Sequence, residues 1–173
     1  MSAFGRRGLV LGLGAALSGC GFRPVYMPRE TGAGGSQAQL GTVRIAQIGD
    51  RSGQLLRQEL QARMDRGEGL AKKYELVVNF VLSSEVIGIQ SDTSASRIRY
   101  VGTGAWSLKT IGIDQKVITT GTTRVLDGLN ILDQQYFEAD LTSETVIRRI
   151  ATNLADNITL QLAAYFARLP AAG

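Results

Sequence analysis

The most regular pattern of apolar positions lies near the C-terminal end of the chain. The residues that recur there at steps of three or four are Ile147, Ile150, Leu154, Ile158 and Leu162. This spacing places side chains on one face of an α-helix. We predict a helix over residues 143–168, with Asp140 or Thr142 as its N-cap and a length of about 39 Å. Ala151 and Ala155 flank the apolar stripe, so this helix can lie close to a sheet.

A shorter unit of the same kind occurs earlier. Alternating apolar positions predict a strand within residues 42–48, and a helix follows with Asp50 or Ser52 as its N-cap. The apolar residues at helical spacing in this second helix are Leu55, Leu56, Leu60 and Met64. Gly67 and Gly69 are expected to end it.

Three long segments rich in Val, Ile, Thr and Tyr lie between the two helices. They cover residues 74–89, 95–110 and 115–126, and short connections with Gly or Asp predict that they pair antiparallel. The element order is strand, helix, three strands, helix. It predicts an α+β fold with a four-stranded mixed sheet and both helices packed on one face, in which the first strand pairs in parallel.

Two helices cover only one side of such a sheet, so its second face is expected to differ in character. In the strand over residues 95–110, alternation places one set of side chains on a polar or mixed face: Arg97, Arg99, Val101 and Thr103. The opposite set is Ile98, Tyr100, Gly102 and Trp106. The first face is expected to meet solvent.

The N-terminus has the order of an export signal. Arg6 and Arg7 precede an apolar stretch over residues 8–17, and Leu17-Ser18-Gly19-Cys20 follows. The tetrapeptide resembles the lipobox of bacterial lipoproteins, which predicts cleavage before Cys20 and attachment of diacylglycerol and an N-acyl chain to it. Several acyl chains form a stable membrane anchor, whereas one holds only marginally. The basic pair leaves open whether export uses the general secretory or the twin-arginine route.

The chain is therefore expected to divide into four parts. Residues 1–19 form the signal peptide, 20–40 the lipidated cysteine and a flexible tether, 41–169 the α+β domain, and 170–173 a tail. Gly21, in place of the Asp that favours inner-membrane retention in enteric bacteria, predicts an outer-membrane location.

Composition narrows the possible chemistry. The formal net charge of +4 falls to +2 when Arg6 and Arg7 leave with the signal, too little to indicate nucleic acid. The chain has no His and its only Cys is Cys20, so we expect no metal site, no cofactor other than the covalent lipid, and no thiol or histidine catalysis.

Paired carboxylates are the remaining route to catalysis. The carboxylates in or near the sheet region are Glu75, Glu85, Asp92, Asp114, Asp127 and Asp133. No pair of them forms a recognisable motif, and we predict no catalytic residue.

Three segments together resemble one known family. They are Cys20-Gly21-Phe22-Arg23-Pro24, the strand leading into Gly53-Gln54-Leu55-Leu56-Arg57-Gln58-Glu59-Leu60, and a closing helix with Arg148-Arg149-Ile150-Ala151 and Leu154-Ala155-Asp156-Asn157-Ile158. With this element order, the chain resembles the lipopolysaccharide-assembly lipoproteins, the plug subunits of the outer-membrane lipopolysaccharide translocon. Arg23-Pro24 departs from the enteric form and is similar to the alphaproteobacterial one.

The resemblance implies a non-enzymatic role. Such a domain is expected to sit in the lumen of a β-barrel partner, on the periplasmic side of its membrane anchor, to help the barrel assemble, and to bind lipopolysaccharide on its way to the cell surface. Because lipopolysaccharide carries phosphates and acyl chains, its site is expected to combine cations with apolar surface. The candidate residues are Arg97, Arg99, Lys109, Lys116 and Arg124, for which ordinary solvated strand positions are the alternative.

Aromatic residues allow two interpretations. Tyr100 and Trp106 are expected in the sheet core, with contact to a partner as the alternative. Leu132, Tyr136 and Phe137 precede the last helix and are expected to pack against its start, with contact to a partner as the alternative.

A second interpretation of function also stands. The alternative is another periplasmic lipid carrier or envelope-assembly lipoprotein, because a fold alone does not define a function. A deep enclosed apolar cavity would favour a carrier, whereas a plug requires exposed complementary surface.

Overall fold

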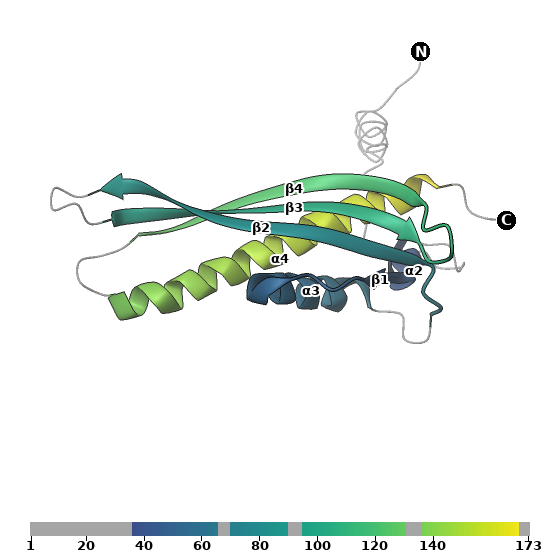
Figure 1. Ribbon diagram of the computed structural model, residues 1–173, viewed down its shortest axis with the longest axis horizontal. Helices are drawn as coiled ribbons and strands as arrows, with labels where there is room; N and C mark the ends of the chain where they lie inside the picture. The colour runs from purple at the N-terminus through teal and green to yellow at the C-terminus, as the bar shows by residue number, and fades with distance from the viewer. Residues whose placement is uncertain (1–35, 66–69, 90–94, 131–135, 170–173) are drawn as a thin grey trace, which may run out of the picture.

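The computed structural model describes residues 36–65, 70–89, 95–130 and 136–169 of the chain (Figure 1). The elements in chain order are α2 (Ser36–Gly41), β1 (Val43–Ile45), α3 (Asp50–Met64), β2 (Tyr74–Ile89), β3 (Ala95–Thr110), β4 (Val117–Asn130) and α4 (Tyr136–Arg168). The order strand, helix, three strands, helix is as predicted, and α2 is added before it.

The sheet has the order β1-β2-β3-β4. β1 pairs with β2 in parallel, and the other two pairs are antiparallel. The parallel pair follows from the helical crossover α3 between β1 and β2, while the short connections between the later strands allow antiparallel pairing. The predicted mixed four-stranded sheet is confirmed.

Both long helices lie on the same side of the sheet (Figure 1). The core fills the space between the two layers, where Leu56 and Leu60 of α3 meet Leu76 and Leu108 of the sheet and Leu154 of α4, all 0% exposed. Burial of such side chains is the main favourable term in folding. The predicted α+β fold, with these two helices on one face, is confirmed.

Small residues bring α4 close to the sheet. Ala151 and Ala155 are fully buried, and a Cβ at Gly102 would lie 2.3 Å from Ile150 Cγ2 of α4. A side chain at position 102 would therefore push the helix away. The predicted close approach through the two alanines agrees with this packing.

Several predicted boundaries were wrong. α4 begins at Tyr136, so Asp140 and Thr142 lie inside the helix and cannot be its N-cap. At 33 residues it is about 50 Å long rather than 39 Å. α3 begins at Asp50 itself, after Gly49 as N-cap, with no side-chain capping bond. Neither Asp50 nor Ser52 therefore caps it.

The strands also differ at their ends. β1 is limited to Val43–Ile45, because only these residues pair with β2, and β4 runs from Val117 to Asn130 rather than over residues 115–126. The short helix α2 replaces the last residues of the predicted tether. Its Leu40 is 0% exposed in the core. That burial explains why residues 36–40 join the domain.

Candidate functional site on the open face of the sheet

The side of the sheet away from the helices is called the open face below. Gly102 and Gly104 of β3 point toward α4, so the odd-numbered residues of β3 point to the open face. The register carries this assignment to the neighbouring strands, with Glu85 opposite Arg99 on β2 and Arg124 opposite Thr103 on β4. Arg97, Arg99, Lys109 and Arg124 therefore share this face, as the alternation along β3 predicted for the first two.

The five candidate cations do not form one cluster. Arg97 and Arg99 lie toward the β2–β3 end of the sheet, and Arg124 is four residues along from Arg99 on the strand axis, about 14 Å away. Lys109 is 12 residues from Arg97 on β3, a separation of about 40 Å. Lys116 lies in the β3–β4 turn, where its backbone N–H bonds to Thr110 Oγ1. The structure thus places Arg97 and Arg99 toward one end of β3 and the two lysines at the other, with Arg124 about midway between Arg97 and Lys109.

The three arginines form a group that we call the arginine patch: Arg97, Arg99 and Arg124. Arg99 Nε lies 3.5 Å from Glu85 Oε2, an ion pair at the limit of contact, and that Nε atom is buried without a hydrogen bond. Within the described ranges, no ion pair is found for Arg97 or Arg124, and both residues are exposed. Two of the three charges are thus available to an anionic ligand.

Apolar side chains lie among these charges. Val81 and Thr103 are paired, and Thr103 is also paired with Arg124, so these three residues form one row across the open face. In the next row Val101 separates Ser83 from Leu126. Val81 is 55% and Leu126 53% exposed. Exposed aliphatic groups beside unpaired guanidinium groups give the patch an amphipathic character.

A hollow of about 380 Å³ lies further along the same face. Its lining is mostly of small side chains: Val77, Asn79, Ala105, Trp106, Ser107, Thr120, Gly121 and Thr122. Because this hollow is open to solvent on the face of the sheet, it differs from the enclosed apolar cavity that the carrier alternative requires.

The two aromatic residues on the other face are structural. Trp106 is 5% exposed, and its Nε1 donates to Gln161 Oε1 of α4 at 3.1 Å. Gln161 Nε2 in turn donates to Thr123 Oγ1 at 3.2 Å. The hydroxyl of Tyr100 lies 3.0 Å from Ser143 Oγ. The core interpretation of both aromatic residues is therefore correct. Leu132 lies outside the described residues, and the side chains of Tyr136 and Phe137 are not described.

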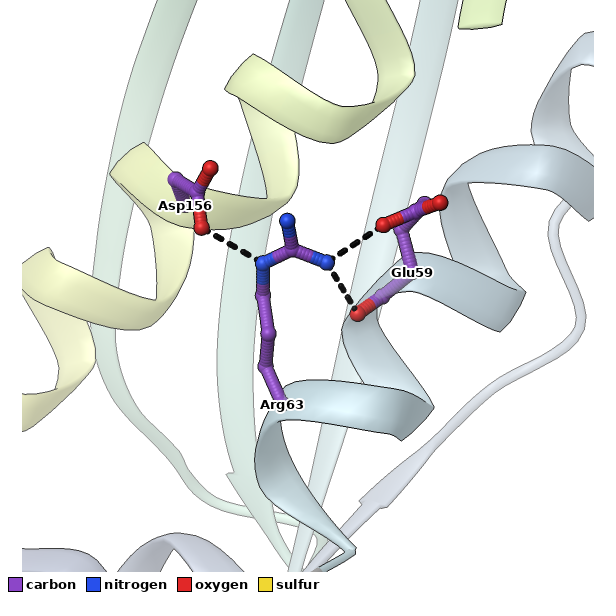
Figure 2. Close-up of polar contacts among 3 residues, drawn as sticks. All are labelled: Glu59, Arg63 and Asp156. Carbon is purple, nitrogen blue, oxygen red and sulfur yellow. Dashed lines mark hydrogen bonds and ion pairs between the residues drawn. The ribbon is translucent and has the colours of Figure 1, made fainter.

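The helix layer is held by its own ion pairs. Arg63 of α3 donates from Nε to Asp156 Oδ1 of α4 at 2.6 Å and from Nη1 to Glu59 Oε2 at 2.5 Å, as Figure 2 shows. The hydrogen bond to Asp156, aided by that to Glu59, raises the pKa of Arg63 above its ordinary value, although partial burial opposes this. Arg63 therefore stays charged and ties α3 to α4.

The carboxylates considered for catalysis are dispersed. Glu75 pairs with Arg44 at 2.8 Å, Glu85 with Arg99, and Asp127 with Arg149 at 2.8 Å. Asp114 is exposed in the β3–β4 turn, and Asp92 and Asp133 lie outside the described residues. Among the residues that the structure describes, no group of three potential metal ligands comes together. Glu75, Glu85 and Asp127 instead serve as partners for surface arginines, a structural use.

The architecture matches a class of bacterial lipoprotein domains. A candidate lipoprotein of Caulobacter crescentus CB15 has a TM-score of 0.62 and 23% identity, with 80% of this chain and 100% of that chain covered. The rare lipoprotein B of Shewanella oneidensis has a TM-score of 0.53 and 10% identity, with 72% of this chain and 96% of that chain covered. An uncharacterised lipoprotein B of Nitrosomonas europaea has a TM-score of 0.54 and 11% identity, with 73% of this chain and 84% of that chain covered. At these identities the likeness establishes the fold.

The family follows from the sequence model. The lipopolysaccharide-assembly family, LptE, matches residues 40–162, more than half of the chain and nearly the whole α+β domain. The chain belongs to this family, which confirms the resemblance seen in the sequence. No curated protein matches it at a significant level. Within the described part of the chain, no helix is long and apolar enough to cross a membrane.

Proposed function

We propose that this protein is an outer-membrane lipoprotein, anchored through Cys20, that plugs and helps to assemble the β-barrel translocon for lipopolysaccharide. In this proposal it also binds lipopolysaccharide during transport to the cell surface. The observation that carries the proposal is the family match over residues 40–162. Cys20 itself lies outside the described residues, and the lipobox-like sequence supports its role as the acylated residue.

The open face suits the proposed ligand. The arginine patch offers guanidinium groups, which bind phosphate through paired N–H donors, and Val81 and Leu126 offer aliphatic contact for acyl chains. The helix layer closes the opposite side of the sheet, so a ligand on the arginine patch leaves the core undisturbed. This division of roles suits a domain that must stay folded inside a partner.

Titration of the purified protein with lipopolysaccharide tests the ligand. We expect Arg97→Gln combined with Arg99→Gln to weaken binding by about tenfold, since two charge-assisted contacts to phosphate are lost. The matched control is Arg51→Gln with Arg148→Gln, which removes two exposed charges that pair with Glu144 on the helix layer. Equal loss in both variants would show that only net charge matters, and unchanged affinity in the first would remove both residues from the site.

A pull-down tests the partner. The protein with a C-terminal tag is recovered from detergent-solubilised outer membranes, and the proteins that co-purify in stoichiometric amount are identified by mass spectrometry. We expect one large β-barrel protein. Recovery of the chain alone, or with a different envelope machine, would contradict the plug role and favour the lipid-carrier or envelope-assembly alternative.

A further inference from the structure

One end of the domain brings together segments from four parts of the chain. The N–H of Lys73 donates to the carbonyl oxygen of Thr42 after α2 at 2.8 Å, and the N–H of Ile111 donates to that of Lys73 at 3.0 Å. Tyr74 packs against Phe166 near the end of α4, with ring centroids 5.6 Å apart. We call this end the base; in Figure 1 it is the end with the C-terminal end of α4. The base therefore contains the β3–β4 turn and the point where the chain enters the domain.

The base exposes an unusual amount of apolar surface. The large hydrophobic residues exposed there are Leu70 (42%), Ile111 (40%), Ile113 (103%), Val117 (48%) and Leu169 (38%). Turns between strands are ordinarily polar, and an isoleucine fully in water gains nothing from packing. In this turn Gly112 has φ 155° and Gln115 φ 34°, so the backbone takes conformations that side chains disfavour while Ile113 projects outward. The turn thus presents an apolar side chain to its surroundings.

Basic residues surround this apolar surface. Among the described residues of the base they are Arg44, Lys72, Lys73, Lys109, Lys116 and Arg168, and the acidic ones are Asp65, Asp114 and Glu75, which lies opposite Lys109 and pairs with Arg44. Lys72 already neutralises Asp65 at 2.8 Å. The excess of positive charge around the exposed aliphatic groups matches an anionic lipid surface, in which aliphatic groups enter the acyl boundary while lysines reach the phosphates.

We propose that the base is a membrane-contact surface, with Ile113 inserted at the headgroup boundary of a phospholipid leaflet and Lys109 and Lys116 on its phosphates. This gives the two lysines a role separate from that of Arg97 and Arg99, which lie toward the opposite end of β3. In the free lipoprotein, before it enters the barrel of the proposed function, the domain then stands on the leaflet with Arg97 and Arg99 directed away from it.

The entry point of the chain supports this orientation, a step that rests on the proposed acylation of Cys20. Helix α2 starts at Ser36 and, at six residues, is about 9 Å long, so its first residue stays near the base. Fifteen residues separate Cys20 from Ser36 and span at most about 55 Å. An anchor at Cys20 thus tethers the domain by its base.

The test uses the lipidated protein reconstituted in vesicles. Acylation consumes the only native thiol, Cys20, so Ile113→Cys can be labelled alone with an environment-sensitive fluorophore. Val86→Cys, 53% exposed near the opposite end of the sheet and outside the arginine patch, is the matched control. In vesicles of phosphatidylethanolamine and phosphatidylglycerol with bromine near the headgroup end of the acyl chains, we expect a blue shift and at least about twofold stronger quenching at position 113 than at 86. Equal quenching would overturn the proposal.

Two further measurements separate the remaining outcomes. Lys109→Gln with Lys116→Gln in the Ile113→Cys background should reduce the blue shift, as should neutral phosphatidylcholine vesicles, whereas Arg51→Gln with Arg148→Gln should leave it unchanged. A blue shift seen only when a protein partner is added would mean that the turn docks on protein and would contradict the membrane role. Mass spectrometry of the acyl groups on Cys20 reports independently on the proposed anchor.

Discussion

Two glycines of the sheet differ in the space that a Cβ atom would have. A Cβ at Gly121 would lie 2.4 Å from Cζ2 of Trp106, whose ring is fixed by burial and by its hydrogen bond to Gln161. At Gly104, on the same face of the sheet, the nearest atom would be at 3.6 Å, an ordinary contact. Position 121 therefore has no room for a side chain, whereas position 104 has room for a methyl group.

This contrast gives a stability prediction. Gly121→Ala should lower the free energy of unfolding by about 1–3 kcal/mol, because the indole must move or the strand must shift. Gly104→Ala, the control, should change it by less than about 0.5 kcal/mol. Urea unfolding followed by Trp106 fluorescence measures both, and a Gly121→Ala variant as stable as the control would show that the ring is free to shift.

At the scale of elements, α4 determines the shape of the domain. It is the longest helix, its Ile150 and Leu154 contact the sheet at the glycines of β3, and Arg63 joins it to α3. The ion pair between Arg63 and Asp156 has one side chain only 19% exposed and the other 56% exposed, so solvent screens it in part.

Loss of the ion pair between Arg63 and Asp156 should lower the free energy of unfolding only slightly. The size of this decrease should not depend on pH near neutrality. Because the pKa of Arg63 is raised in the folded state, its contribution is fully present below the unfolded-state pKa and is lost only as pH rises through the folded-state value, far above neutral. Arg63→Met should therefore destabilise by about 1 kcal/mol equally from about pH 6 to pH 9. Arg148→Met, whose ion pair with Glu144 is 3.8 Å long, is the control with a smaller effect. Urea unfolding at several pH values measures the free energy of unfolding of both variants. A destabilisation confined to one end of the pH range would contradict an Arg63 that stays charged throughout it.

For the molecule as a whole, the two ends of the sheet differ in chemistry. Arg97 and Arg99 lie toward the β2–β3 end, and the apolar and basic base lies at the other, with about 40 Å along β3 between Arg97 and Lys109. In the proposed arrangement, the anchored domain presents Arg97 and Arg99 away from the leaflet, and the tether and the base together set its orientation.

The anchor itself is tested by Cys20→Ala. The variant should keep its fold, because the described domain begins at Ser36, but should no longer fractionate with the outer membrane. Ser18→Ala, which keeps a small residue and the thiol, should fractionate as the original protein does. Membrane fractionation and thermal unfolding by circular dichroism measure the two properties, and firm outer-membrane binding of Cys20→Ala would rule out lipid anchoring there.

The sequence by itself determined the element types, the mixed sheet and the family, because these depend on local periodicity and on motifs that neighbouring residues carry. It also placed Arg97 and Arg99 on the face away from the helices, since alternation along a strand is local. The cap of α3 was missed because Gly49, with no side-chain capping bond, occupies the N-cap position, and both candidates for α4 were wrong because the helix begins ahead of them at Tyr136.

Only the tertiary structure decided which cations lie together. The register of β3 with β4 brings Arg124 to the same face as Arg99, and the length of the strands carries Lys109 and Lys116 to the far end. It also revealed the base, whose residues come from segments distant in sequence. These segments meet because the start of β2, the β3–β4 turn and the end of α4 lie at one end of the domain. Proximity between distant segments is set by pairing and packing, and no local pattern in the chain encodes it.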